Sequence, residues 1–217
     1  MILVPTTSVD DWKRLLADPE KHWKDGYSAH ALATRWQNTK GFPSEVAALL
    51  ETTEATAGAT LLLAIPEHQV PLAGGARASQ TDLWALARTS RGLLSIAVEG
   101  KVSESFGPTV GEWQSGSSAG KRERWAALCA LLEVEQQCDL AVRYQLFHRT
   151  ASALLEARRF FAIGAVVIVH SFSRSQESFG DFQRFVALMG GSVSGPEQLV
   201  SVAPREGLGL SFGWAQG

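Results

Sequence analysis

Two apolar segments of strand length, joined by a short turn, most restrict the folds that this chain can adopt. Residues 82–87 form the first segment and residues 93–99 the second. The polar residues 89–92 between them are few enough for a tight connection, and connections of this length typically join antiparallel strands. The pattern therefore predicts a β-hairpin whose two strands enter a hydrophobic core.

Charged residues lie at the end of this hairpin that is farthest from its turn. Asp82 precedes the turn by about as many residues as Glu99 follows it, so antiparallel pairing would make them close neighbours. Side chains alternate along a strand, so Glu99 and Lys101 project from one face and Gly100 from the other. Charges at the rim of a core are costly unless they are paired. The set is therefore either an ion-paired strand end or a functional site.

The chemistry of these residues suits a divalent cation and a phosphate group. Two carboxylates with a backbone carbonyl and water provide the hard oxygen ligands that Mg²⁺ prefers. A bound Mg²⁺ or Mn²⁺ ion can polarise a phosphodiester and supply hydroxide. Lys101 could position the attacking water and stabilise the charge that develops at phosphorus.

The rest of the chain predicts an α/β fold with a mixed central sheet flanked by helices. Helices are expected at residues 10–23, 28–36, 45–50, 121–134, 143–160 and 179–189, strands at 162–170 and 208–214, a short apolar run at 60–65 that ends at Pro66, and an exposed loop at 106–120.

The element order together with Asp82 and the triplet Glu99-Gly100-Lys101 resembles the PD-(D/E)XK, or restriction-endonuclease-like, nuclease superfamily. The resemblance covers about residues 28–170. The length of 217 residues predicts one domain over residues 1–217, in which an N-terminal helical addition and a C-terminal helix–strand addition flank this core. The motifs Gly74-Gly75 and Ser79-Gln80-Thr81-Asp82 are also similar to uncharacterised bacterial nuclease-like proteins. The proline of the family pattern is absent before Asp82, where Thr81 stands.

The resemblance also implies further site residues. An acid on a preceding helix often completes the metal site in this superfamily, and Glu45 is the best match, with Glu51 as its rival. Glu45 is equally explained by a favourable place in the first turn of its helix. The helix after the triplet often supplies polar groups, for which the candidates here are Gln145, His148 and Arg149. A solvent-facing helix surface is the alternative for these three, and His170 is expected to be a structural histidine.

These features predict a metal-dependent nuclease that hydrolyses phosphodiester bonds in DNA. A catalytically inactive relative that binds nucleic acid or a protein partner is the alternative, and a hydrolase of another phosphate ester is a third. The net charge of −2 argues against a general basic coat for nucleic acid. Two cysteines, no signal peptide and no long apolar run favour a cytoplasmic protein without a membrane span. A homodimer is compatible with the sequence.

Overall fold

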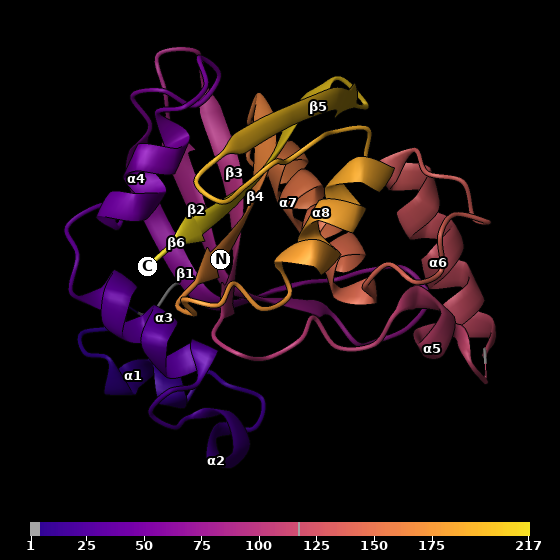
Figure 1. The fold of residues 1–217 in the computed structure, drawn as a ribbon, viewed down its shortest axis with the longest axis horizontal. Coiled ribbons are helices and arrows are strands. Elements are labelled where there is room, and N and C mark those ends of the chain that lie inside the picture. Colours follow the sequence, from indigo (N-terminus) through magenta and orange to yellow (C-terminus); the bar gives the residue numbers. More distant parts are fainter. Residues whose placement is uncertain (1–4, 117) are drawn as a thin grey trace.

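The computed structural model describes residues 5–116 and 118–217, which form a six-stranded mixed sheet with helices on both faces (Figure 1). The strands lie in the order β1-β2-β3-β4-β6-β5. Strand β2 is antiparallel to both β1 and β3, β5 is antiparallel to β6, and β3, β4 and β6 are mutually parallel. The expected α/β fold with a mixed central sheet is confirmed. The strands are β1 (Thr60–Val70), β2 (Ser79–Arg88), β3 (Leu93–Lys101), β4 (Gly164–Ser171), β5 (Leu199–Arg205) and β6 (Leu208–Gln216).

Eight helices are present in the described part of the chain. They are α1 (Asp10–Lys13), α2 (Pro19–His22), α3 (Ser28–Gln37), α4 (Ser44–Leu50), α5 (Val110–Gln114), α6 (Ala119–Leu132), α7 (Tyr144–Arg159) and α8 (Phe179–Leu188). The N-terminal helices cover one face of the sheet, and α7 and α8 cover the other (Figure 1). Helix α7 connects the parallel strands β3 and β4.

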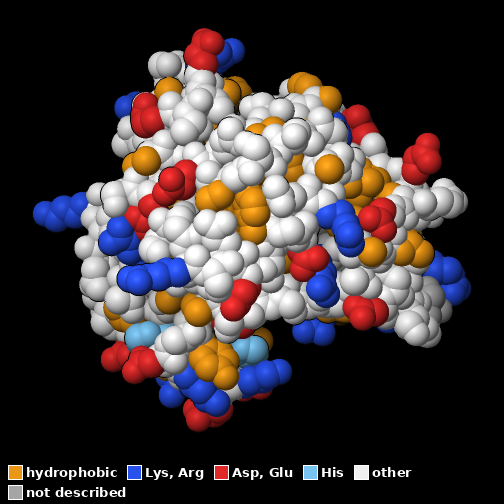
Figure 2. All heavy atoms as spheres, viewed as in Figure 1, with side chains coloured by type: hydrophobic (Ala, Val, Ile, Leu, Met, Phe, Trp, Pro, Cys, Tyr) orange, Lys and Arg blue, Asp and Glu red, His pale blue; other side chains and the backbone are white. Residues whose placement is uncertain are grey.

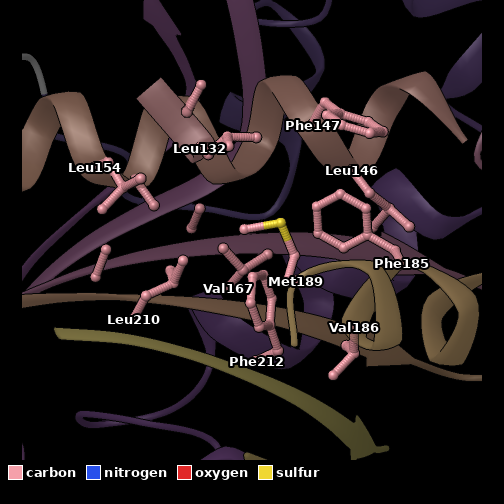
Figure 3. Packing of buried hydrophobic residues seen from close by; sticks show 14 of the residues in the cluster. Leu132, Leu146, Phe147, Leu154, Val167, Phe185, Val186, Met189, Leu210 and Phe212 are labelled. Atoms are coloured by element: carbon pink, nitrogen blue, oxygen red, sulfur yellow. The ribbon is translucent and has the colours of Figure 1, made fainter. Parts of the chain in front are cut away.

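The predicted hairpin is present as β2 and β3, and its alternating side chains divide between two cores. Leu83, Ile96 and Val98 point to the N-terminal helices and pack in one cluster with Leu32 and Leu49. The other cluster joins α6, α7 and α8 to the opposite face of the sheet (Figure 3). Since Glu99 is adjacent to Val98, its side chain projects to the α7 face.

Four local features differ from the expectations. Pro19 begins a separate helix, with Asp18 as its N-cap, so residues 10–23 form two short helices. Strand β1 continues beyond Pro66 to Val70, because an outer strand tolerates the missing N–H of proline. The expected loop at 106–120 contains α5, which Thr109 and Glu112 close with a capping box. The edge strand β5 was not predicted.

The surface is mixed in charge. On the face shown in Figure 2, acidic and basic side chains alternate without a large area of one sign. Among the described residues, no helix is both long and apolar enough to cross a membrane.

Candidate functional site

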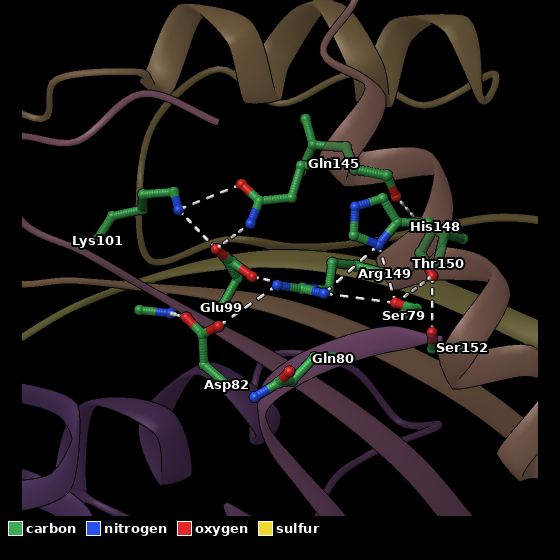
Figure 4. Close-up of polar contacts among 12 residues, drawn as sticks. Ser79, Gln80, Asp82, Glu99, Lys101, Gln145, His148, Arg149, Thr150 and Ser152 are labelled. Atoms are coloured by element: carbon green, nitrogen blue, oxygen red, sulfur yellow. Dashed lines mark hydrogen bonds and ion pairs between the residues drawn. The ribbon is translucent and has the colours of Figure 1, made fainter. Parts of the chain in front are cut away.

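Glu99 is the centre of a buried ionic cluster at the carboxyl end of β3 (Figure 4). Its Oε1 accepts hydrogen bonds from Nζ of Lys101 at 2.6 Å and from Nε2 of Gln145 at 2.7 Å. Its Oε2 accepts one from Nε of Arg149 at 2.6 Å. Glu99, Lys101 and Arg149 are only 2%, 4% and 6% exposed. Such burial is sustainable because each charge has an opposite partner.

Asp82 lies beside this cluster on the neighbouring strand, as the hairpin register requires. Its Oδ2 accepts a hydrogen bond from the backbone N–H of Gly100 at 2.9 Å. Its Oδ1 lies 3.4 Å from Nη2 of Arg149, so a single guanidinium contacts both Asp82 and Glu99. The side chain of Asp82 is 22% exposed, which makes it the more open of the two carboxylates. The two predicted acids therefore do meet on one face of the sheet.

Helix α7 supplies the polar groups that the sequence singled out. Gln145 and Arg149 are one helical turn apart, and both reach Glu99. His148 lies between them, and its Nδ1 is 2.8 Å from Oγ of Ser79 at the start of β2. The alternative of a solvent-facing helix surface does not describe Gln145 or Arg149.

A third acid that the sequence analysis missed, Glu67, stands at the level of Asp82 on the outer strand β1. In the β1–β2 ladder Pro66 faces Leu83 and His68 faces Thr81, with Glu67 between them. Glu67 has a positive φ of 52° and accepts a hydrogen bond from Gln80 at 2.7 Å. A left-handed conformation is uncommon for a residue with a side chain and often marks a functional position.

The sequence did hold one signal for Glu67. It is the first acid after the apolar run at 60–65, at the distance along the chain that antiparallel pairing with β2 requires. The strand predicted from the sequence ends at Pro66, so Glu67 was not considered as a neighbour of Asp82. We refer to Glu67, Asp82 and Glu99 as the acid cluster.

The structure places Glu45 and Glu51 away from the acid cluster. Glu45 lies on α4, which covers the opposite face of the sheet, and it binds Arg35 and Nε2 of His170. Burial opposes its ionisation, but these two partners lower the pKa of Glu45 below its ordinary value. Glu51 accepts a backbone hydrogen bond in the turn after α4. The buried ring of His170 also accepts from Trp36, so the expectation of a structural histidine is confirmed.

The acid cluster contains three carboxyl groups, and two cations, Lys101 and Arg149, are paired with them. Burial, followed by the nearby charge of Asp82, raises the pKa of Glu67 to about 8. Burial and then the charge of Glu99 raise the pKa of Asp82 to about 6. Burial also disfavours the ionised form of Glu99, but Arg149 and Lys101 outweigh it and lower the pKa of Glu99 to about 2. Three carboxylates thus share two buried cations.

The cluster borders a cavity of about 470 Å³. Its lining includes the acid cluster, Lys101 and Gln145 on one side. Residues of the N-terminal helical segment, such as His22 and Ser28, complete it. The carboxyl end of a strand in an open α/β sheet is where such folds typically bind ligands.

One family matches almost the whole chain. The sequence fits the family described as a domain of unknown function, DUF6946, over residues 5–217. The chain belongs to the DUF6946 family. No curated protein and no solved structure matches it.

The donor set of this DUF6946 chain fits a hard divalent cation in its chemistry. The available ligands are carboxylate oxygens, and burial, followed by the charge of a neighbouring carboxylate, raises the pKa of Glu67 and Asp82, a penalty that a bound cation would reduce. Arg149 is a competing cation, since it already contacts Asp82 and Glu99. In residues 5–116 and 118–217, no group of three or more His, Cys, Asp or Glu side chains is already arranged as a metal site.

Proposed function

We propose that this protein is a metal-dependent nuclease that hydrolyses phosphodiester bonds in DNA. The proposal depends on one observation. Asp82, Glu99 and Lys101 lie together on one face of the sheet, at the carboxyl end of β3, where they border a cavity. Gln145 joins them from the helix that follows β3. The chain order of helix, three strands, helix and strand supports the resemblance to the PD-(D/E)XK superfamily, and these four strands lie side by side in the sheet.

Each residue has a separate role in this proposal. Asp82 and Glu99 would hold a Mg²⁺ or Mn²⁺ ion, with Glu67 in place of the helix acid. The ion would polarise the phosphate and lower the pKa of a bound water. Lys101 would face the charge that develops on the phosphate oxygens. Glu99 and Gln145 hold its ammonium group in place, which spares reorganisation during the reaction.

Arg149 favours a second candidate, a nuclease-like protein that binds nucleic acid or a protein without cleaving it. Its guanidinium neutralises both Glu99 and Asp82. It therefore already supplies part of the charge compensation that a divalent cation would supply. In this alternative the ion pairs stabilise the packing of α7 on the ends of β2 and β3, and the cavity serves for binding alone.

Calorimetric titration with Mn²⁺ and Mg²⁺, together with cleavage assays on supercoiled, linear and single-stranded DNA, separates the two candidates. Asp82→Ala should abolish both metal binding and cleavage. Lys101→Ala should lower cleavage by about 10²–10³-fold while metal affinity stays close to that of the wild type, because the ammonium stabilises transition-state charge. Asp25→Ala is the matched control, since that carboxylate is 98% exposed.

Two results would count against the proposal. Metal binding without cleavage of any DNA would favour the non-cleaving alternative. No metal binding, combined with a loss of about 3–5 kcal/mol of stability in both variants, would leave only a structural ion-pair network.

A further inference from the structure

A second cavity of about 580 Å³ adjoins the one at the acid cluster. The two cavities share part of their lining, including Arg77, Gln80 and His148, and therefore form one continuous groove. We call the half that contains the acid cluster the acidic half and the other the basic half.

The two halves of the groove differ in charge. Four acids, Glu67, Asp82, Glu99 and Glu104, line the acidic half together with Lys101, Arg77 and Arg149. The described residues that line the basic half include three arginines, Arg77, Arg124 and Arg149, and no Asp or Glu. A site for cations thus continues into a site for anions, which is the arrangement that a chain of phosphates beside a bound metal would need.

Arg77 is the arginine of the basic half that is free to bind a ligand. Arg149 is held by the acid cluster, and Arg124 donates hydrogen bonds to the carbonyls of Ala73 and Gly75. Arg77 is exposed, lines both cavities, and has no hydrogen-bond or ion-pair partner among the described residues.

The turn that precedes Arg77 packs closely against α6. Gly74 has a φ of 78°, and a Cβ at this position would lie 2.2 Å from the carbonyl oxygen of Gly120 on α6. Only glycine at this position permits such a close approach. The side chain of Arg124 also donates hydrogen bonds to the backbone of the same turn. Arg77 therefore follows directly after a turn that is anchored to α6.

His148 offers a second donor to the same place. Its Nδ1 lies 2.8 Å from the hydroxyl of Ser79 and 3.4 Å from Nη1 of Arg149. The guanidinium of Arg149 can only donate, so Nδ1 is the acceptor of this contact and the ring proton is placed on Nε2. Burial, and then the positive charges of Arg149, Arg124 and Arg77, keep the pKa of His148 well below its ordinary value, so the ring is neutral at pH 7.

We propose that Arg77 and the Nε2–H of His148 bind the phosphate next to the scissile one, so that the substrate is a polynucleotide strand and not a mononucleotide or other simple phosphate ester. The inference rests on the proposed function for the place of the scissile phosphate. Arg77 supplies the charge and His148 a neutral donor, and both line the acidic and the basic halves.

Binding is tested on the full chain with a fluorescent single-stranded DNA oligonucleotide, by anisotropy in EDTA and in Ca²⁺ over a range of KCl concentrations. Arg77→Ala should weaken binding about tenfold and reduce the slope of log K against log salt by about 0.7, the value for one phosphate on a single strand. Arg77→Lys should keep the slope. Arg88→Ala is the control, because this exposed arginine lies at the other end of β2.

Catalysis gives an independent measure. In Arg77→Ala, hydrolysis of the oligonucleotide should show a higher KM at nearly unchanged kcat, since the lost contact exists in both ground and transition states. A chromogenic diester with a single phosphate should be a poor substrate, and Arg77→Ala should reduce its hydrolysis by a smaller factor than hydrolysis of the oligonucleotide.

The outcomes separate the two proposals. Equal binding by Arg77→Ala, Arg88→Ala and the wild type overturns the inference, even if the wild type cleaves DNA. Absence of oligonucleotide binding by the wild type in both EDTA and Ca²⁺ also overturns it. A wild type that binds no metal and cleaves nothing, but loses oligonucleotide binding with Arg77→Ala, refutes the nuclease and retains the phosphate site.

Discussion

Replacing Glu67 by glutamine should stabilise the protein, and by more as the pH rises. The carboxylate of Glu67 has its pKa raised to about 8 by burial and by Asp82, against an ordinary value of 4.5. Glutamine has the same shape and can still accept the hydrogen bond from Gln80. The substitution therefore removes the repelling charge and little else.

The size of the effect follows from proton linkage. Between pH 4.5 and 8 the folded protein binds more protons at Glu67 than the unfolded chain, so its contribution to stability falls as pH rises. The penalty is absent below pH 4.5 and fully developed above pH 8. It amounts to about 1 kcal/mol at pH 5, about 3 at pH 7 and about 4 at pH 8, as upper values, because Asp82 titrates with Glu67 and shares the same repulsion.

Urea denaturation of the wild type and Glu67→Gln from pH 4.5 to 8.5 measures this difference. Glu54→Gln is the control, since its side chain is 92% exposed. Saturating Mn²⁺ should raise the stability of the wild type more than that of Glu67→Gln, because a cation would replace the missing charge compensation. This last result also tests whether Glu67 belongs to the proposed metal site.

The reasoning would be refuted by a Glu67→Gln protein that is no more stable than the wild type at pH 8. A constant difference between pH 5 and pH 8 would equally show that Glu67 is not a buried acid of raised pKa. A loss of stability at every pH would assign its carboxylate to a structural hydrogen bond.

Three further predictions concern other parts of the molecule. Gly74→Ala should lower the free energy of unfolding in urea by about 1–3 kcal/mol, because its Cβ would overlap α6. Gly107→Ala is the control and should lower it by about 1 kcal/mol, since its φ is also positive but no atom lies within 4 Å of the added Cβ. Glu45→Gln should leave the Mn²⁺ affinity unchanged. It should be less stable than the wild type at pH 7, and in denaturation melts this difference should shrink as the pH falls below the ordinary value of 4.5 toward the lowered pKa of Glu45. Ser95→Ala should cost about 1–3 kcal/mol, measured by denaturation at pH 7, because it leaves the indole N–H of Trp84 without its buried acceptor.

Local patterns in the sequence were enough to predict most elements and half of the site. Short-range alternation defined the hairpin, and it put Asp82 opposite Glu99 because antiparallel register follows from the turn. The same alternation put Glu99 and Lys101 on one face. Helical spacing also placed Gln145 and Arg149 together on α7, since residues four apart share a side of a helix.

Only the tertiary structure decided which further groups reach those residues. Glu45 and Glu67 are both acids near predicted elements, and the choice between them depends on which face of the sheet α4 covers and on how far β1 continues past Pro66. The local patterns in the sequence show neither fact, because both result from packing between segments distant in the chain. The contact of Arg149 with both acids, and the raised pKa of Glu67 and Asp82, arise in the same way: Coulomb interactions and burial depend on distances in space.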